Sequence, residues 1–139
     1  MTKTIVGLAL VAINAYVAAQ EPKTTWSGVY TDAQAKRGDA AYASLCASCH
    51  SPDLSGVDAA PPLTGNEFNA GWNDLPLNDL LERMRTTMPA DKPGSLSRQD
   101  AADIIAFILS KDHFPTGETD LPTEAEPLKQ IKFLSVKPR

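Results

Sequence analysis

The sequence predicts a small all-α domain with three main helices, short helical turns and long loops. Apolar residues recur at helical spacing, and Ser or Thr stands three positions before Gln, Glu or Asp where helices are expected to begin. No stretch alternates apolar and polar residues in the manner of a half-buried strand. The chain has 139 residues, which suits one domain of ordinary size.

The first main helix is predicted over residues 32–45. Thr31 is expected to cap it, Gln34 completes a capping box, and the Ala-rich stretch that follows favours helix. Gly38 and Tyr42 lie one turn apart on one face. Glycine costs a helix about 1 kcal/mol relative to alanine. We therefore expect Gly38 to let another helix approach closely, with Tyr42 filling the space beside it.

Mostly loop is expected after this helix, with one short helix through Phe68 that a Thr64–Glu67 capping box begins. The second main helix is predicted over residues 77–85, and the third from Ser97 to about Ser110. Their apolar faces are Leu77, Leu80, Leu81 and Met84 in the second, and Ala101, Ile104, Ile105, Phe107 and Ile108 in the third.

The ends of the chain are expected to lie outside the domain of residues 31–112. Residues 1–19 have the pattern of a secretory signal peptide, with small residues before a cut that leaves Gln20 as the mature start. The alternative is a membrane anchor, but the apolar run is shorter than the roughly 20 residues of a spanning helix. Residues 20–30 are expected to be a loose lead-in. Residues 113–139 form a C-terminal extension expected to pack on the domain, the alternative being a flexible terminus.

The only two cysteines belong to a C-x-x-C-H motif, Cys46 to His50. This spacing is the attachment signature for a c-type haem, because two thiols can add to the two porphyrin vinyl groups while the adjacent imidazole binds the iron. A redox dithiol and half of a zinc site are the alternatives. The zinc set is poor because His50 adjoins Cys49 and the other histidine, His113, is remote. The thioredoxin-like alternative requires a βαβ context that is missing.

A wider pattern surrounds the motif. Its members are Gly38 and Tyr42 ahead of Cys46, Pro61-Pro62-Leu63 after His50, Met88-Pro89, and Ile104 and Phe107 in the last helix. With these positions the stretch from Thr31 to Ser110 resembles the class I monohaem cytochromes c. The resemblance implies the small cytochrome c fold, in which helices and long loops wrap around one covalently bound haem c.

A closer likeness is to the small cytochromes associated with quinoprotein (PQQ) dehydrogenases. It depends on Pro61 to Gly65, Phe68, Trp72, and the segments Phe114 to Gly117 and Leu121-Pro122. The resemblance implies that the Pro61 carbonyl accepts a hydrogen bond from His50, that Leu63 presses on the haem face, and that Trp72 donates to a haem propionate. The alternative for Trp72 is a plain core residue.

The same resemblance makes His50 and Met88 the two ligands of the iron. Met88 lies in irregular chain before a proline, whereas its rival Met84 has helical core spacing. Met/His ligation raises the haem potential. His113, just beyond the last helix, is expected to be a solvated surface residue. Arg83 and Arg85 are expected on a solvated helix face, with propionate pairing as the alternative.

The expected function is that of a periplasmic electron carrier. Two protein ligands leave no open iron position for a substrate. The donor is expected to be a dehydrogenase, of the quinoprotein class in the closest likeness, and the acceptor an oxidase or another cytochrome. A haem enzyme or gas sensor with a displaceable Met88 is the alternative. The net charge of −4 argues against a nucleic-acid partner, because phosphate contacts require a basic face.

Overall fold

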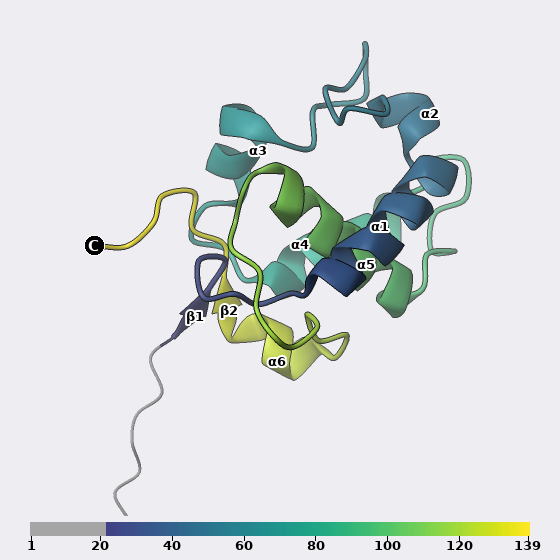
Figure 1. The fold of residues 1–139 in the computed structure, drawn as a ribbon. Helices are drawn as coiled ribbons and strands as arrows, with labels where there is room; N and C mark the ends of the chain where they lie inside the picture. The colour runs from purple at the N-terminus through teal and green to yellow at the C-terminus, as the bar shows by residue number, and fades with distance from the viewer. Residues whose placement is uncertain (1–21) are drawn as a thin grey trace, which may run out of the picture.

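The computed structural model describes residues 22–139, so the predicted signal peptide and its cleavage site lie outside the described residues. In chain order the elements are β1 (Lys23–Thr24), α1 (Asp32–Leu45), α2 (Ala47–His50), α3 (Gly65–Trp72), α4 (Leu77–Thr87), α5 (Arg98–Lys111), α6 (Ala125–Lys129) and β2 (Ile131–Lys132) (Figure 1). The predicted all-α class is confirmed. Within the described range, no helix has the length and apolar character required to cross a membrane.

The crossing of α1 and α5 is the centre of the fold (Figure 1). A Cβ built on Gly38 would lie 1.8 Å from the backbone oxygen of Asp103 and 2.9 Å from Cβ of Phe107, so only glycine allows this approach. The Tyr42 and Phe107 rings pack beside it with centroids 5.3 Å apart. The prediction that Gly38 marks a helix crossing is confirmed.

The helix starts show where local sequence signals hold. Thr31 accepts a hydrogen bond from the Gln34 backbone N–H, and Ser97 accepts one from that of Asp100, both at 3.0 Å. The prediction of a Thr64–Glu67 capping box is wrong, because the Thr64 side chain makes no capping hydrogen bond. The helix itself, α3, continues past Phe68 to Trp72. Helix α4 ends at Thr87 instead of Arg85, because the Met88 N–H still donates to the carbonyl of Met84.

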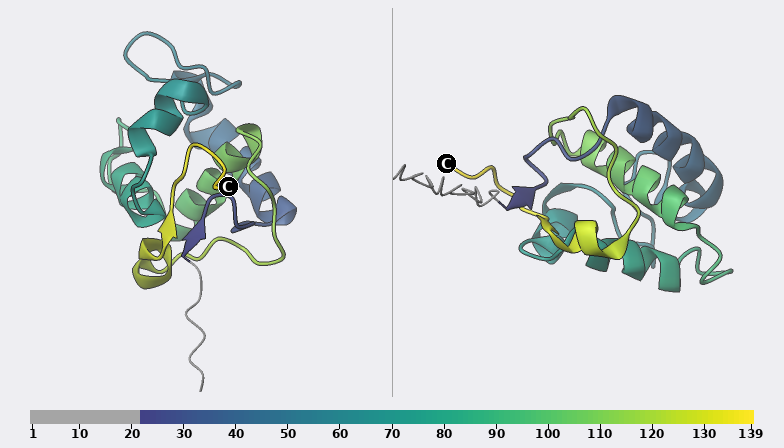
Figure 2. Two further views of the ribbon diagram at one scale, coloured as in Figure 1. Left: turned by 90° about the vertical axis from the view of Figure 1, so that its left-hand side faces the viewer. Right: turned by 90° about the horizontal axis from the view of Figure 1, so that it is seen from below.

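The two short strands are a feature that the sequence does not indicate. β1 and β2 pair in parallel, Lys23 with Ile131 and Thr24 with Lys132, and join the lead-in to the C-terminal extension (Figure 2). The lead-in is therefore not loose from residue 23 onward. The Trp26 indole N–H donates to the Leu134 carbonyl at 2.9 Å. Two-residue strands are too short to produce a pattern of alternation.

The C-terminal extension lies along the helical domain. Its side chains Leu121, Leu128, Ile131 and Phe133 are buried, whereas Val136 is 76% exposed. The Gln34 side chain, which the capping box would turn back onto its own helix, instead exchanges hydrogen bonds with the backbone of Leu121. Gln34 thus fastens the extension to α1.

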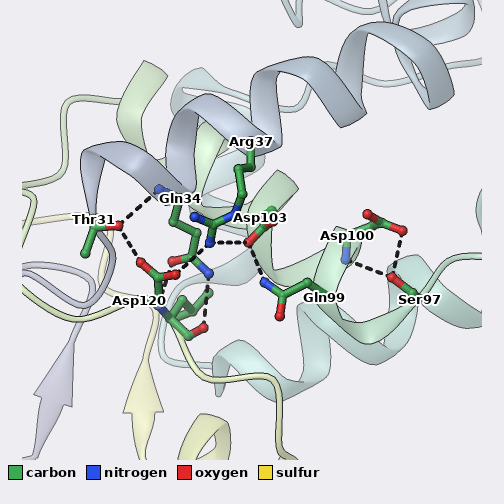
Figure 3. Close-up of polar contacts among 9 residues, drawn as sticks. Thr31, Gln34, Arg37, Ser97, Gln99, Asp100, Asp103 and Asp120 are labelled. Atoms are coloured by element: carbon green, nitrogen blue, oxygen red, sulfur yellow. Dashed lines mark hydrogen bonds and ion pairs between the residues drawn. The ribbon is translucent and has the colours of Figure 1, made fainter.

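A polar network completes this attachment (Figure 3). Arg37 on α1 donates to buried Asp103 on α5, with Nε 3.0 Å from Oδ2, and also to Asp120 of the extension at 2.6 Å. Asp120 accepts a further hydrogen bond from the Thr31 hydroxyl, and Gln99 donates to Asp103 at 2.8 Å. One guanidinium therefore joins α1, α5 and the extension.

Candidate functional site

A cleft of about 890 Å³ opens among α2, the loop after it, α3, α4 and the start of the 88–96 loop. Its volume lies within the range of small-molecule and cofactor sites, about 300–1,000 Å³. Every site residue predicted from the sequence lines it: Cys46, Cys49, His50, Pro61, Leu63, Trp72 and Met88. Apart from Ser48, Glu67, Arg83, Thr87 and Asp91, the other lining residues are apolar or glycine.

His50 is held in one orientation at this cleft. Its side chain is buried, and Nδ1 lies 2.8 Å from the Pro61 carbonyl oxygen. A carbonyl can only accept, so Nδ1 is the donor, and in the neutral form of the ring Nε2 keeps its lone pair. The Tyr42 hydroxyl fixes the chain just beyond His50 by donating to the Ser51 carbonyl at 2.6 Å. The imidazole is thereby oriented with one ring nitrogen already satisfied and with Nε2 as the nitrogen that a metal can bind.

The two cysteines are free thiols, Cys46 half-buried and Cys49 exposed. Burial raises the pKa of the Cys46 thiol to about 11. The attacking cysteine of a redox dithiol instead has a lowered pKa, so Cys46 does not have the environment of such a thiol. Nowhere in residues 22–139 do three or more His, Cys, Asp or Glu side chains come together to hold a metal ion. The zinc alternative therefore has no support in the described residues.

Met88 reaches the cleft from a different part of the chain. It is the C-cap residue that follows α4, with extended backbone at φ −123° and ψ 152°. Met84, one turn earlier, also lines the cleft and packs against the hydrophobic core. The structure therefore brings both methionines to the cleft, and the irregular backbone distinguishes Met88.

The third side of the cleft is α3, with Phe68 and Trp72. Arg83 lines the cleft, but Arg85 does not: its Nε donates to the Leu96 carbonyl at 3.2 Å, which gives it a structural role. His113 is exposed and lies away from the cleft. No residue of the extension lines the cleft, so in the described structure the extension does not cover it.

Sequence reasoning assigned no site role to several lining residues. Leu80, Leu96, Ile104 and Ile108 all line the cleft. Leu80, Ile104 and Ile108 were expected on the apolar faces of their helices, which is the signal that places them toward the interior. The spacing alone does not distinguish a side chain that contacts a cofactor from one that contacts another helix.

The family model described as "Cytochrome C oxidase, cbb3-type, subunit III" matches residues 33–108. The chain belongs to this cytochrome family. The covalent haem c that this membership implies fits the residues present: two free thiols, an imidazole oriented through Nδ1 so that Nε2 is left to bind a metal, and an apolar cleft of sufficient size. The protein is therefore a haem c cytochrome, and its broad role is haem-based electron transfer.

Two further similarities agree with this membership. The thiosulfate dehydrogenase of Stutzerimonas stutzeri (strain A1501) is 35% identical to the cytochrome over 82 residues, which are 55% of this chain and 27% of that protein. The cytochrome thus spans only about a quarter of the length of that relative. The structure of the sulfane dehydrogenase SoxCD from Paracoccus pantotrophus matches with a TM-score of 0.53 and 22% identity, covering 93% of this chain and 68% of that one. At this identity the likeness concerns the fold.

Proposed function

We propose that this cytochrome is an exported, periplasmic one-electron carrier whose haem is attached to Cys46 and Cys49 and bound axially by His50 and Met88. The observation that carries the proposal is the arrangement of the cleft. The oriented imidazole of His50 and the thioether of Met88 come to one apolar cleft from segments on either side of α3 in the sequence.

The residues at this site have different roles toward the haem. Cys46 and Cys49 hold the cofactor covalently, so it is not lost with a weak ligand. The Pro61 carbonyl holds the Nδ1 proton of His50 and so keeps Nε2 available. Leu63, Leu80 and Ile104 limit access of water. When bound, the haem supplies the one-electron couple, and a thioether ligand favours the ferrous form and so raises its potential.

For the electron donor and the electron acceptor we infer the class of protein, from the chemistry of the site. An iron whose two axial positions are both occupied by protein ligands has no position for a substrate. An accessible cleft mouth suits electron transfer through a small, transient docking surface. We propose a dehydrogenase as donor, and the resemblance to cytochromes associated with quinoprotein dehydrogenases makes that class the first candidate. The name of the Stutzerimonas relative is consistent with a dehydrogenase setting. An oxidase or another cytochrome is the proposed acceptor. Reduction of the haem on mixing with a candidate dehydrogenase and its substrate tests the donor.

The ligand assignment is tested by two methionine substitutions. Met88→Ala should remove the near-infrared sulfur-to-iron absorption band, lower the midpoint potential and open the ferrous iron to carbon monoxide, with the haem still covalently attached. Met84→Leu should preserve all of these properties, because it exchanges one packing side chain for another of similar volume. Exchanged behaviours would make Met84 the ligand. Carbon monoxide binding to the unmodified protein would favour the enzyme or gas-sensor alternative.

A further inference from the structure

Helix α3 forms one wall of the cleft, yet within the described structure it packs closely against no other helix. The close helix pairs, apart from the consecutive α1 and α2, are α1 with α5, α4 with α5 and α4 with α6. α3 nevertheless contributes Glu67, Phe68, Gly71 and Trp72 to the cleft lining. The position of this wall therefore depends on contacts at its ends and on two side chains that pack against the core, the buried Phe68 and the partly buried Trp72.

The start and the middle of α3 are held by residues from the C-terminal part of the chain. The Gly65 N–H donates to the carboxylate of Asp112, at 2.9 Å to Oδ1 and 3.2 Å to Oδ2. The Phe68 ring meets the Phe133 ring edge to face, with centroids 6.2 Å apart. Phe133 belongs to the extension and is itself almost fully buried.

The chain immediately after α3 is fastened to the same part of the extension. The backbone N–H and the hydroxyl of Ser135 both donate to Oδ1 of Asn73, each at 2.9 Å. The Asp74 N–H donates to the Phe133 carbonyl, and the Phe133 N–H donates to the Leu75 carbonyl, both at 2.8 Å. The extension therefore continues the hydrogen bonding of the cleft wall beyond the end of its helix.

The other edge of this extension segment is attached to the lead-in. Thr25 is fully buried, donates its backbone N–H to the Lys132 carbonyl at 3.0 Å, and exchanges hydrogen bonds with Leu134 through its hydroxyl. We call residues 131–135 the strap. The strap lies between the lead-in on one side and residues 73–75 on the other (Figure 2, left).

We propose that the strap positions α3, and with it Trp72, and so keeps the cleft closed around the haem. The inference rests on the proposed function, because it takes His50 and Met88 as the iron ligands. A segment held by few contacts opens locally at lower free energy than the rest of a fold. If the strap is weakened, α3 opens more often, water and small ligands reach the iron, and greater exposure favours the charged ferric form.

Two substitutions of buried residues separate this role from general stability. Phe133→Ala removes the strap side chain that contacts α3. Leu128→Ala removes a fully buried side chain of α6, which packs on α4. We expect Phe133→Ala to raise the imidazole affinity of the ferric protein at least about tenfold, the equivalent of about 1.4 kcal/mol, and to lower the potential. Leu128→Ala should change the imidazole affinity less than about twofold at a temperature where both variants are folded.

A second pair of variants, which disturbs the core less, tests the same proposal if Phe133→Ala does not fold. Asn73→Ala removes the acceptor of both Ser135 hydrogen bonds. It should raise the imidazole affinity by about fivefold, because the two hydrogen bonds that are lost are exposed and each makes a small net contribution. A chain that ends at Ser135 lacks only the exposed residues 136–139 and should bind imidazole like the complete chain.

The outcomes distinguish the two proposals. If the unmodified protein lacks the sulfur-to-iron band, the ligation proposed above fails whatever the strap does. If that band is present but Phe133→Ala and Leu128→Ala raise the imidazole affinity equally, or if Asn73→Ala leaves it unchanged, the strap inference is overturned. A selective effect of Phe133→Ala and Asn73→Ala supports it.

Discussion

The α1–α5 crossing and the α3 wall of the cleft are held in opposite ways. At the crossing, the contacts belong to the two helices themselves: Gly38 admits the α5 backbone, and Tyr42 packs on Phe107. The α3 wall is held from outside, by Asp112 at its start and by the strap at its end. A change at the crossing should therefore lower the stability of the whole domain, whereas a change at the wall should first affect local opening.

The largest loss of stability is expected when a larger side chain fills the space at the α1–α5 crossing. Gly38→Val adds a Cβ where the Asp103 backbone oxygen is only 1.8 Å away, so α1 and α5 must separate. We expect a loss of about 3 kcal/mol in the free energy of unfolding, the upper end for an overpacked core. Urea unfolding measures it, with the exposed Ala43→Val on the same helix as control. Equal stability of the two variants would contradict the crossing.

A smaller loss is expected where the crossing joins the extension. Arg37→Ala leaves the buried Asp103 carboxylate with only Gln99 as a side-chain donor. The Arg37 side chain is 47% exposed, so solvent screens part of the interaction. We therefore expect a loss of stability that is smaller than that of Gly38→Val and smaller than the loss for a fully buried ion pair. Lys36→Ala, which changes an exposed neighbour, is the control, and a similar loss in it would rule out a specific role for Arg37.

The start of α3 provides a test of whether this helix opens separately from α1 and α5. Asp112→Ala removes the carboxylate that accepts from the Gly65 N–H. The loss of a helix cap costs about 1 kcal/mol. We expect faster amide hydrogen exchange in residues 65–72, while the amides of α1 and α5 keep their protection. Uniform acceleration in all three helices would show that α3 does not open separately.

The smallest expected effect is on the stability of the protein at low pH. Hydrogen bonds from the Thr31 hydroxyl and from Arg37 hold the pKa of Asp120 below its ordinary value of 3.8. The stabilisation is therefore present above that value and is lost as pH falls below it. The side chain is 45% exposed, so we expect less than about 1 kcal/mol. Urea midpoints of Asp120→Asn should fall below those of the unmodified protein at pH 7 and converge with them near pH 2. Glu118→Gln, which changes an exposed neighbour, should show no such convergence.

Sequence reasoning was most accurate where the signal is local. The bounds of α1 and the caps of α1 and α5 are confirmed because side chains within one or two turns determine them. The role of Gly38 is also confirmed, because a glycine within a helix pattern indicates a close approach even though it does not name the partner. It was wrong where a distant residue replaced the local partner. The Thr64 side chain does not cap α3, and the carboxylate that accepts from the Gly65 N–H at the helix start belongs to Asp112, 47 positions away. The Gln34 amide bonds to Leu121, 87 positions away, instead of its own helix start.

The chain alone therefore indicated the helices, the haem attachment motif and a set of residues expected around one cofactor. These depend on spacing over a few residues, where backbone geometry leaves little choice. The attachment of the strap, which holds the α3 wall, was decided only by the tertiary structure. The Thr25 hydroxyl exchanges hydrogen bonds with the backbone of Leu134, 109 positions away, and the Thr25 backbone N–H donates to the Lys132 carbonyl. Backbone donors and acceptors are the same at every residue except proline, so which of them pair across such a distance depends on how the helices have already packed.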